Sequence, residues 1–308
     1  MESKAVFWVN SLPVAWVQEL AKEPLTTIPP RYIRPDLQEQ PIVSDDGLVL
    51  EIPIIDMQSL LSEESMEAEL TKVDFACREW GFFQLVNHGV SSSMLENVKK
   101  GAQGLFNLPM EEKKKYWQCP GEMEGFGQAF VFSEEQELDW GDLFFIVTQP
   151  PHLRKSHLFP KLPHPFREAL ELYSLELKNL AMAILRNALT ILLHANEVEG
   201  LQVKKDGKWV PVKPLQNAFI VNIGDSLEIV TNGAYRSIEH RVTVNSVMER
   251  LSIGTFYNSK SDGEIGPARS LISQEKPALF KRITTEEYGR VKIASKLNGK
   301  SHLETFRL

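Results

Sequence analysis

The sequence contains few cysteines and no long apolar run. Only Cys77 and Cys119 occur in 308 residues, which is too few for a disulfide scaffold, so we interpret both as idle or buried thiols. No apolar stretch approaches the roughly 20 residues that a membrane-spanning helix requires. The first 20 residues include an apolar patch, but polar residues and a proline interrupt it, and it lacks the basic start and cleavage site of a signal peptide. These absences predict a cytoplasmic protein without a membrane partner.

The chain also lacks an excess of basic charge. It has 34 lysines and arginines against 41 aspartates and glutamates, a net charge of -7, which argues against nucleic acid as the main partner. Hydrophobic residues at 43% and charged residues at 24% are ordinary for a globular protein. The length allows a large core in one or two domains. Internal repeats and low-complexity tracts are absent.

Hydrophobic periodicity predicts a helix-rich first half. Apolar residues recur at helical spacing in three segments, 64–80, 91–105 and 165–187. Two further segments, 51–56 and 81–89, are typical of short strands. The stretch 120–165 is rich in prolines and aromatic residues, and such a long irregular region usually carries function or packs over a site.

The second half is typical of β-structure. Turn signals such as Asp206-Gly207 and Asn232-Gly233 separate short strand-like segments. These segments are 189–194, 200–204, 209–212, 218–223, 237–244 and 250–257. Their spacing predicts an antiparallel sandwich or barrel. The tail, 275–308, is expected to form two short helical pieces.

The segment between these two halves lacks a clear signal that ends the helix. Across 180–193 the pattern changes from a helical period to strand-like content with no glycine or proline, although helices commonly end at a glycine or shortly before a proline. Only Asn187 offers a stop signal. Either the helix continues through the apolar block, or a segment that normally lies between them is missing.

His240, Arg250 and Ser252 are the strongest candidates for a functional site. Arg250 and Ser252 are two residues apart in a strand-like segment, so their side chains project from the same face. An arginine fork beside a hydroxyl suits a carboxylate ligand. His240 lies in the preceding strand-like segment and suits a metal ion. Together they are typical of half of a metal-plus-carboxylate site.

Several long motifs occur in order over nearly the whole chain, in the segments 52–56, 76–89, 124–128, 217–225, 237–241 and 250–252. Together they resemble the plant 2-oxoglutarate- and Fe(II)-dependent dioxygenases, in particular the senescence-related and alkaloid-demethylase-like branch. The resemblance implies an α+β protein with a mostly β core, a double-stranded β-helix or jelly roll flanked by helices. We expect an N-terminal helical and mixed region (1–187), a truncated jelly-roll domain (188–260) and a C-terminal helical tail (261–308).

By this resemblance, iron is held by a His-x-Asp pair and a later histidine, which matches His240. Arg250 and Ser252 match the residues that hold the distal carboxylate of 2-oxoglutarate. No His-x-Asp occurs in the 308 residues, so the two other family ligands of the metal are absent. The family pattern resumes at Ala188, within the same segment that lacks a glycine or proline to end the helix. We therefore expect a jelly roll that is incomplete by roughly two strands.

Three carboxylates near the predicted site are weaker candidates for a replacement ligand. Glu239 is adjacent to His240 and should face the other side of the strand. Asp225 follows Gly224 and is interpreted as a turn residue. Nothing in the pattern supports Glu228.

The remaining histidines are interpreted as structural or loop residues. His194-Ala195-Asn196 is rejected as a replacement for His-x-Asp, because it follows the strand-like segment that lies beyond the family's metal pair and because asparagine is a poor Fe(II) ligand. His88 closes a strand and turn. The others lie among prolines in the irregular region: His152, His157 and His164.

The resemblance implies an enzyme that uses Fe(II), 2-oxoglutarate and, as reductant, ascorbate to hydroxylate, demethylate or desaturate a small hydrophobic specialised metabolite. Five phenylalanines fit the mouth of its pocket or the core equally well: Phe126, Phe130, Phe132, Phe144 and Phe145. For this chain the missing His-x-Asp favours an inactive splice form, gene-model product or pseudoenzyme, whose open sheet edges promote self-association. A third hypothesis is a ligand- or partner-binding module. Short motifs do not identify the substrate.

Overall fold

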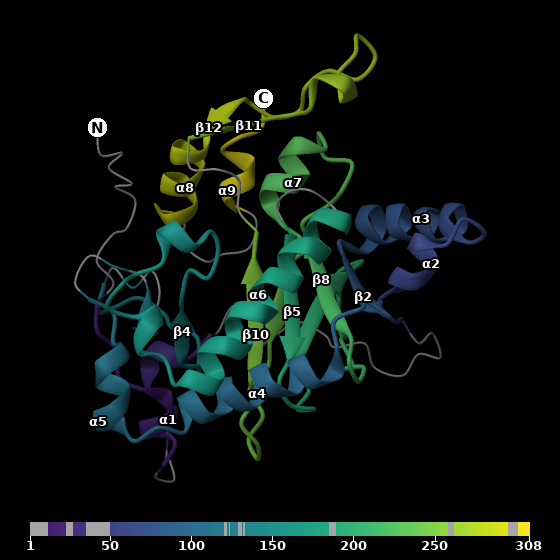
Figure 1. Ribbon diagram of the computed structural model, residues 1–308. Coiled ribbons are helices and arrows are strands. Elements are labelled where there is room, and N and C mark those ends of the chain that lie inside the picture. Colours follow the sequence, from purple (N-terminus) through teal and green to yellow (C-terminus); the bar gives the residue numbers. More distant parts are fainter. Residues whose placement is uncertain are drawn as a thin grey trace. The chain divides into compact units, whose positions relative to one another are not determined.

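The chain divides into two compact units that alternate along the sequence, residues 1–40 with 96–175 and residues 41–95 with 176–308 (Figure 1). The computed structural model describes residues 12–22, 27–34, 50–119, 122, 124–128, 131, 133–184, 189–257, 262–294 and 301–308. The join at Asn187 and Ala188 lies outside the described residues. The predicted division into 1–187, 188–260 and 261–308 therefore stays a prediction.

The first unit is organised around the buried ring of Phe126, which is 2% exposed. Its centroid lies 5.1 Å from that of Trp16, 5.2 Å from that of Phe106 and 4.8 Å from that of Phe144, within the range of favourable aromatic contacts. Phe126 therefore belongs to the core, whereas Phe130 and Phe132 lie outside the described residues. The elements around it are α1 (Val17–Leu20), α5 (Met110–Lys113), β3 (Gly125–Gly127) and β4 (Leu143–Phe145).

Two long helices each cross the boundary between units, α4 (Ser92–Phe106) and α6 (His164–Ile184). Buried residues of α6 recur three or four positions apart, as an amphipathic helix requires. They are Phe166, Ala169, Leu170, Tyr173, Leu177, Leu180 and Ala181. Both helices confirm the predictions made from hydrophobic periodicity for segments 91–105 and 165–187.

The main sheet of the second unit has the strand order β1-β2-β8-β5-β10. Its strands are β1 (Ile54–Asp56), β2 (Phe82–Val86), β5 (Leu189–His194), β8 (Phe219–Ile223) and β10 (Ser252–Phe256). β1 and β2 are parallel, and the other pairs are antiparallel. The register places His194 opposite Ser252.

A second sheet has the order β7-β6-β9 and consists of β6 (Leu201–Lys205), β7 (Lys208–Pro211) and β9 (His240–Val242). Residues of both sheets share one core, namely Ile52, Trp80, Phe82, Leu201, Val203, Val210, Val212 and Ile220. The strand predicted over 237–244 is observed as β9, which has only three residues. Among the described residues neither sheet closes into a barrel.

The N-terminal helices of the second unit are fixed by recognisable end signals. Asp56 accepts hydrogen bonds from the amides of Gln58 and Ser59 and so caps α2 (Met57–Leu61). Helix α3 (Met66–Phe75) continues as a π-helical turn over Ala76–Trp80 and ends at Gly81, whose φ of 59° is left-handed. The predicted helix over 64–80 is confirmed.

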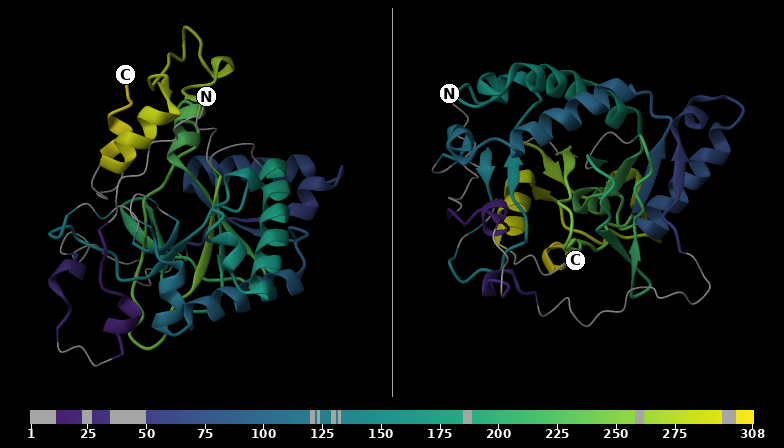
Figure 2. Two further views of the ribbon diagram at one scale, coloured as in Figure 1. Left: turned by 60° about the vertical axis from the view of Figure 1, so that its left-hand side comes forward. Right: turned by 90° about the horizontal axis from the view of Figure 1, so that it is seen from below.

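The C-terminal elements gather beside α7 beyond one end of the main sheet (Figures 1 and 2). They are α7 (Asp225–Val230), β11 (Glu264–Ile265), β12 (Ile283–Thr284), α8 (Thr285–Ala294) and α9 (Ser301–Glu304). The interpretation of Asp225 as a turn residue was wrong, because Asp225 begins α7. Its carboxylate lies 2.7 Å from the His302 ring, so it ties α7 to α9. Among the described residues, no helix combines the length and apolarity needed to cross a membrane.

Candidate functional site

Ser252 begins β10 and Arg250 precedes the strand, which is shorter than the predicted 250–257, but the two side chains meet as their spacing predicts. The Arg250 guanidinium donates to the Ser252 hydroxyl over 3.3 Å. Its other terminal nitrogen lies 3.5 Å from Nδ1 of His194, which ends the neighbouring strand β5. Strand pairing therefore places a buried histidine beside the pair, a contact that the sequence does not indicate because 56 residues separate His194 from Arg250.

Asn196 holds the backbone on both sides of Arg250. Its side-chain amide donates to the carbonyl oxygen of Glu249 over 2.8 Å, and its carbonyl oxygen accepts from the amide of Leu251 over 3.2 Å. In the His194-Ala195-Asn196 motif, His194 therefore contacts the Arg250 side chain, and Asn196 positions the Arg250 backbone.

The charge of Arg250 is incompletely compensated within the described residues. The side chain is half-buried, its Nε is buried without a hydrogen-bond partner, and it makes no ion pair there. Burial lowers the pKa of the guanidinium. Because a buried cation without a counter-charge is costly, Arg250 is suited to bind an anion, and its fork geometry fits a carboxylate.

His240 is exposed on β9. Its Nδ1 lies 3.2 Å from the carbonyl oxygen of Ile238, to which it donates in the Nδ1–H tautomer. The ring also meets Phe82 edge-on at 5.1 Å. Nε2 is then the atom available to a ligand.

The described residues do not complete an iron site around His240. Lys204 Nζ lies 3.1 Å from the Glu239 carboxylate, and Asp225 is paired with His302. The Glu228 carboxylate accepts the Ser237 amide over 2.7 Å. His240 is in no group of three close ligand atoms within the part of the chain that is described. A facial iron site needs three such protein ligands, so iron does not fit these residues, whereas a carboxylate fits Arg250 and Ser252.

His88 serves the fold. It is buried, its Nε2 lies 2.8 Å from the Asn217 carbonyl oxygen, and its Nδ1 accepts from the Val90 amide. Burial lowers the pKa of this imidazole, which favours the neutral ring that these contacts require.

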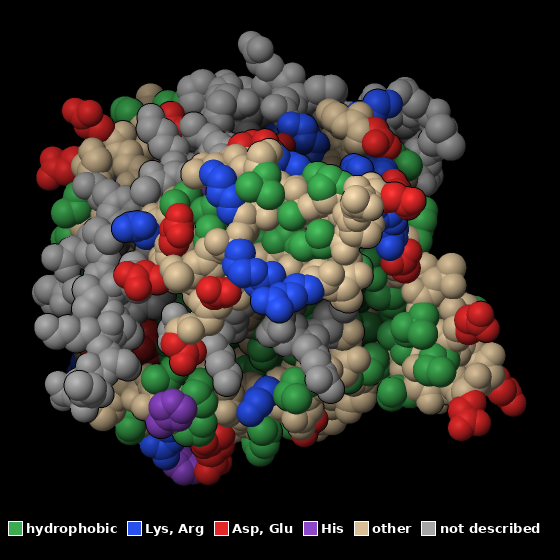
Figure 3. All heavy atoms as spheres, turned by 90° about the horizontal axis from the view of Figure 1, so that it is seen from above, with side chains coloured by type: hydrophobic (Ala, Val, Ile, Leu, Met, Phe, Trp, Pro, Cys, Tyr) green, Lys and Arg blue, Asp and Glu red, His purple; other side chains and the backbone are tan. Residues whose placement is uncertain are grey.

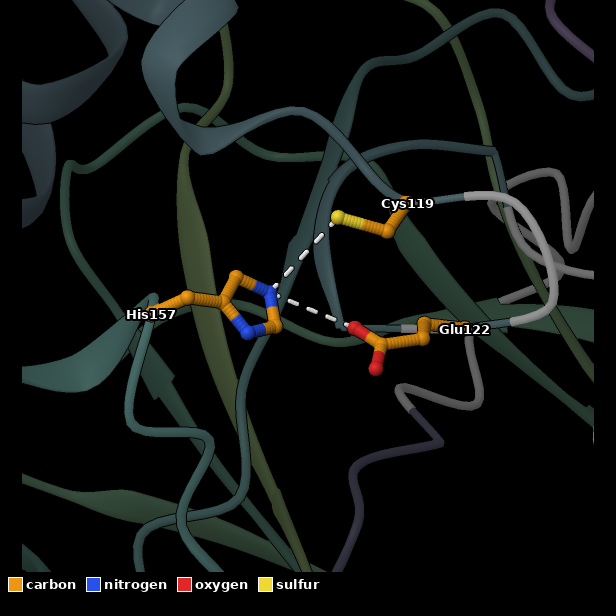
Figure 4. Close-up of side chains that lie close together, drawn as sticks. All are labelled: Cys119, Glu122 and His157. Carbon is orange, nitrogen blue, oxygen red and sulfur yellow. Dashed lines mark hydrogen bonds and ion pairs between the residues drawn. The ribbon is translucent and has the colours of Figure 1, made fainter.

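A second group of potential ligands lies in the first unit, where the side chains of Cys119, Glu122 and His157 converge (Figure 4). The sequence predicts an idle or buried thiol at Cys119 and a loop residue at His157. Because 38 residues separate Cys119 from His157, the spacing of these residues in the sequence does not indicate that their side chains meet.

Surface charge is mixed on the face shown in Figure 3, where acidic and basic side chains are interspersed among hydrophobic ones. The figure shows this face alone.

The fold and the sequence together define the class of protein. Residues 52–164 match the profile of the non-haem dioxygenase in morphine synthesis N-terminal domain, and residues 163–259 match the 2OG-Fe(II) oxygenase superfamily. The chain belongs to the 2-oxoglutarate- and Fe(II)-dependent oxygenase family. Members of this family use Fe(II) and 2-oxoglutarate.

Among its curated relatives, protein SRG1 of Arabidopsis thaliana is 50% identical over the full length of both chains. The flavonoid 7-O-demethylase 1 of Ocimum basilicum is 46% identical, over all of this chain and 94% of the relative. Codeine O-demethylase of Papaver somniferum is 45% identical over 97% of each. The alignment with SRG1 runs over 358 positions, against 308 residues in this chain, so dozens of positions have no residue here.

Solved structures share the fold. The crystal structure of JOX2 in complex with 2OG, Fe and JA is 32% identical, with a TM-score of 0.83 over 96% of this chain and 98% of that chain. The rice dioxygenase for auxin oxidation, at 22% identity, has a TM-score of 0.71 over 84% of this chain and all of that chain. The expected jelly-roll fold is confirmed.

Proposed function

We propose that this fold serves 2-oxoglutarate-dependent oxidation of a small hydrophobic specialised metabolite, and that the 308-residue chain retains only the 2-oxoglutarate half of the site. Relatives that demethylate a flavonoid and codeine support the substrate class and the reaction type. In this chain Arg250 and Ser252 bind the distal carboxylate of 2-oxoglutarate, and His240 marks the metal position without its companion ligands.

The observation that carries the proposal is the Arg250 guanidinium, whose Nε is buried without a hydrogen-bond partner among the described residues. It lies next to the Ser252 hydroxyl and has no carboxylate partner among the described residues. A dicarboxylate ligand supplies the missing negative charge. Without three metal ligands the chain binds the co-substrate but does not turn it over.

Calorimetry with 2-oxoglutarate tests the binding half. Arg250→Met should weaken binding at least tenfold, because a hydrogen bond to a charged group contributes about 1.5–3 kcal/mol and 1.4 kcal/mol corresponds to about tenfold in affinity. Arg290→Met removes the same charge from an exposed position on α8 and should leave the affinity unchanged. Equal affinities in the wild type and Arg250→Met would refute the assignment.

An active oxygenase is the second candidate, favoured by the high identity to enzymes over nearly the whole chain. Succinate release measured with Fe(II), 2-oxoglutarate and ascorbate separates the two. We expect no turnover above that of His240→Ala. Turnover that His240→Ala abolishes would establish the active enzyme and overturn the half-site proposal.

We also propose that the chain self-associates through open sheet edges. β1 and β10 end the five-stranded sheet, and β7 and β9 end the three-stranded one, and such edges readily pair with another chain. Large hydrophobic side chains are exposed on β9, on β10 and between them: Val242, Val244, Val247, Met248 and Phe256.

Light scattering after size exclusion tests this association. Phe256→Lys places a charge on β10 and should shift the protein toward monomer. Leu61→Lys changes another exposed hydrophobic residue, on α2, and should have no effect. A wild-type chain that stays monomeric at high concentration would contradict the proposal.

We infer a cytoplasmic location, supported by the free thiols of Cys77 and Cys119, since reducing compartments preserve thiols. A fluorescent fusion protein in plant cells tests it, and secretion of the fusion would refute it.

A further inference from the structure

We propose that Cys119, Glu122 and His157 form a binding site for a divalent zinc-type metal ion. The site lies in the first unit and shares no residue with the candidate site at Arg250. Its three ligand atoms lie within 4.8 Å of one another (Figure 4). A thiolate, an imidazole and a carboxylate are three ligand types that Zn²⁺ accepts.

Two of the three separations between the ligand atoms match tetrahedral coordination. Zn–S, Zn–N and Zn–O bonds of about 2.3, 2.0 and 2.1 Å at tetrahedral angles separate sulfur from nitrogen by about 3.6 Å and nitrogen from oxygen by about 3.4 Å. In the structure, Sγ of Cys119 lies 3.7 Å from Nε2 of His157. The same Nε2 lies 3.3 Å from Oε2 of Glu122. These two separations therefore need little change to take up the ion.

The group is incompletely satisfied without an ion. Oε2 of Glu122 is buried and accepts no hydrogen bond within the described residues. His157 directs one nitrogen, with at most one proton, toward both the sulfur and this oxygen. A cation between the three atoms satisfies all of them at once.

The surrounding charges orient the ligand carboxylate. Lys155 Nζ binds the other oxygen, Oε1, of Glu122 at 2.9 Å, as outer hydrogen bonds to ligand carboxylates commonly do. Glu124 lies near the group, but its Oε2 accepts the Val147 amide at 2.8 Å. Glu122 is thus held with Oε2, not Oε1, facing His157 and the position of the ion.

The ligand set indicates which ion binds. The soft thiolate disfavours Mg²⁺ and Ca²⁺ and favours Zn²⁺ or a similar d-block ion. Three protein ligands leave a fourth position for water or an external ligand. The bound ion links Cys119 to a segment 38 residues away and so cross-links the first unit.

Metal titration of the full 308-residue chain tests the site. Co²⁺ should produce a thiolate-to-cobalt charge-transfer absorption, which Cys119→Ser removes. In calorimetry with Zn²⁺, His157→Gln and Glu122→Gln should each weaken binding at least tenfold. His152→Gln, an exposed neighbour in the same irregular region, and His240→Ala, at the other candidate site, should leave the affinity unchanged.

Thiol reactivity gives a readout that needs no variant. Cys119 is exposed and Cys77 is buried, so the fast-reacting thiol of the native protein is Cys119. Zn²⁺ should slow its modification, and Mg²⁺ should not. A cobalt spectrum without a charge-transfer band, unchanged Zn²⁺ affinity in His157→Gln, or modification at the same rate with and without Zn²⁺ would overturn the proposal.

Discussion

At the scale of residues, the fold pairs some charges and leaves others uncompensated. Asp225 and His302 come from segments 77 residues apart and meet at 2.7 Å, while the Arg250 guanidinium has no carboxylate among the described residues. The first arrangement stabilises the fold. The second costs stability and is typical of a ligand site.

The pair of Asp225 and His302 makes stability depend on pH. Burial raises the pKa of the Asp225 carboxyl, but hydrogen bonds from His302 and Ser237 and the positive charge of His302 outweigh it and lower the pKa to about 2. A depressed carboxyl pKa stabilises the folded state above the unfolded pKa of about 3.9, and this contribution disappears as pH falls toward 2.

Asp225→Asn should therefore lower the free energy of unfolding by about 2 kcal/mol at pH 7 and by progressively less between pH 4 and pH 2. Urea denaturation at several pH values measures the difference. Asp206→Asn, at an exposed turn position, is the control and should show almost no loss. A loss at Asp225→Asn that does not change with pH would contradict the assigned cause.

At the scale of elements, Gly81 determines how closely the end of α3 and its π-helical turn approach the residues that precede β9. It has a φ of 59°, and a Cβ there would overlap the carbonyl oxygen of Arg236 and lie 2.6 Å from Cγ1 of Ile238. The amide of Arg236 also donates to the Cys77 carbonyl over 3.0 Å. This close approach fixes the segment that leads to His240.

Gly81→Ala should destabilise the protein by at least about 2 kcal/mol, because a left-handed residue with a Cβ costs roughly 1–2 kcal/mol and the overlap adds to that cost. Gly207→Ala is the matched control. Gly207 is also left-handed, with a φ of 77°, but a Cβ there would meet nothing within 4 Å. Thermal unfolding should show the larger loss at Gly81, and equal losses would mean that the contact with residues 236–238 contributes nothing.

At the scale of the whole molecule, the chain has the fold of its family, but its alignment with SRG1 runs over 358 positions against the chain's own 308 residues. His240, Arg250 and Ser252 come from the C-terminal part of the matched region. The half-site is proposed because the sequence contains the residues that would bind the co-substrate but no His-x-Asp pair.

A chimera tests this directly. Replacing the stretch around Asn187 and Ala188 by the stretch of Arabidopsis SRG1 that aligns with it should give about one bound iron per chain and 2-oxoglutarate-dependent succinate release. The unmodified chain should bind less than a tenth as much iron in metal analysis. The same chimera with His240→Ala should lose both properties. Stoichiometric, tightly bound iron in the unmodified 308-residue chain would refute the half-site.

The sequence by itself determined the family, most helices and strands, and the juxtaposition of Arg250 and Ser252. Each of these depends on contiguous motifs or on the local periods of 2 and 3.6 residues, which act within one element. It missed α7 and placed Asp225 in a turn, because the partner of Asp225 is distant in the chain.

Only the tertiary structure decided which residues meet across elements. Strand pairing brings His194 within reach of Arg250 across 56 residues, and loop packing brings Cys119 within reach of His157 across 38. It also shows that the carboxylates considered as iron ligands are engaged elsewhere among the described residues. Such contacts depend on how the chain folds back on itself, which short-range spacing does not encode.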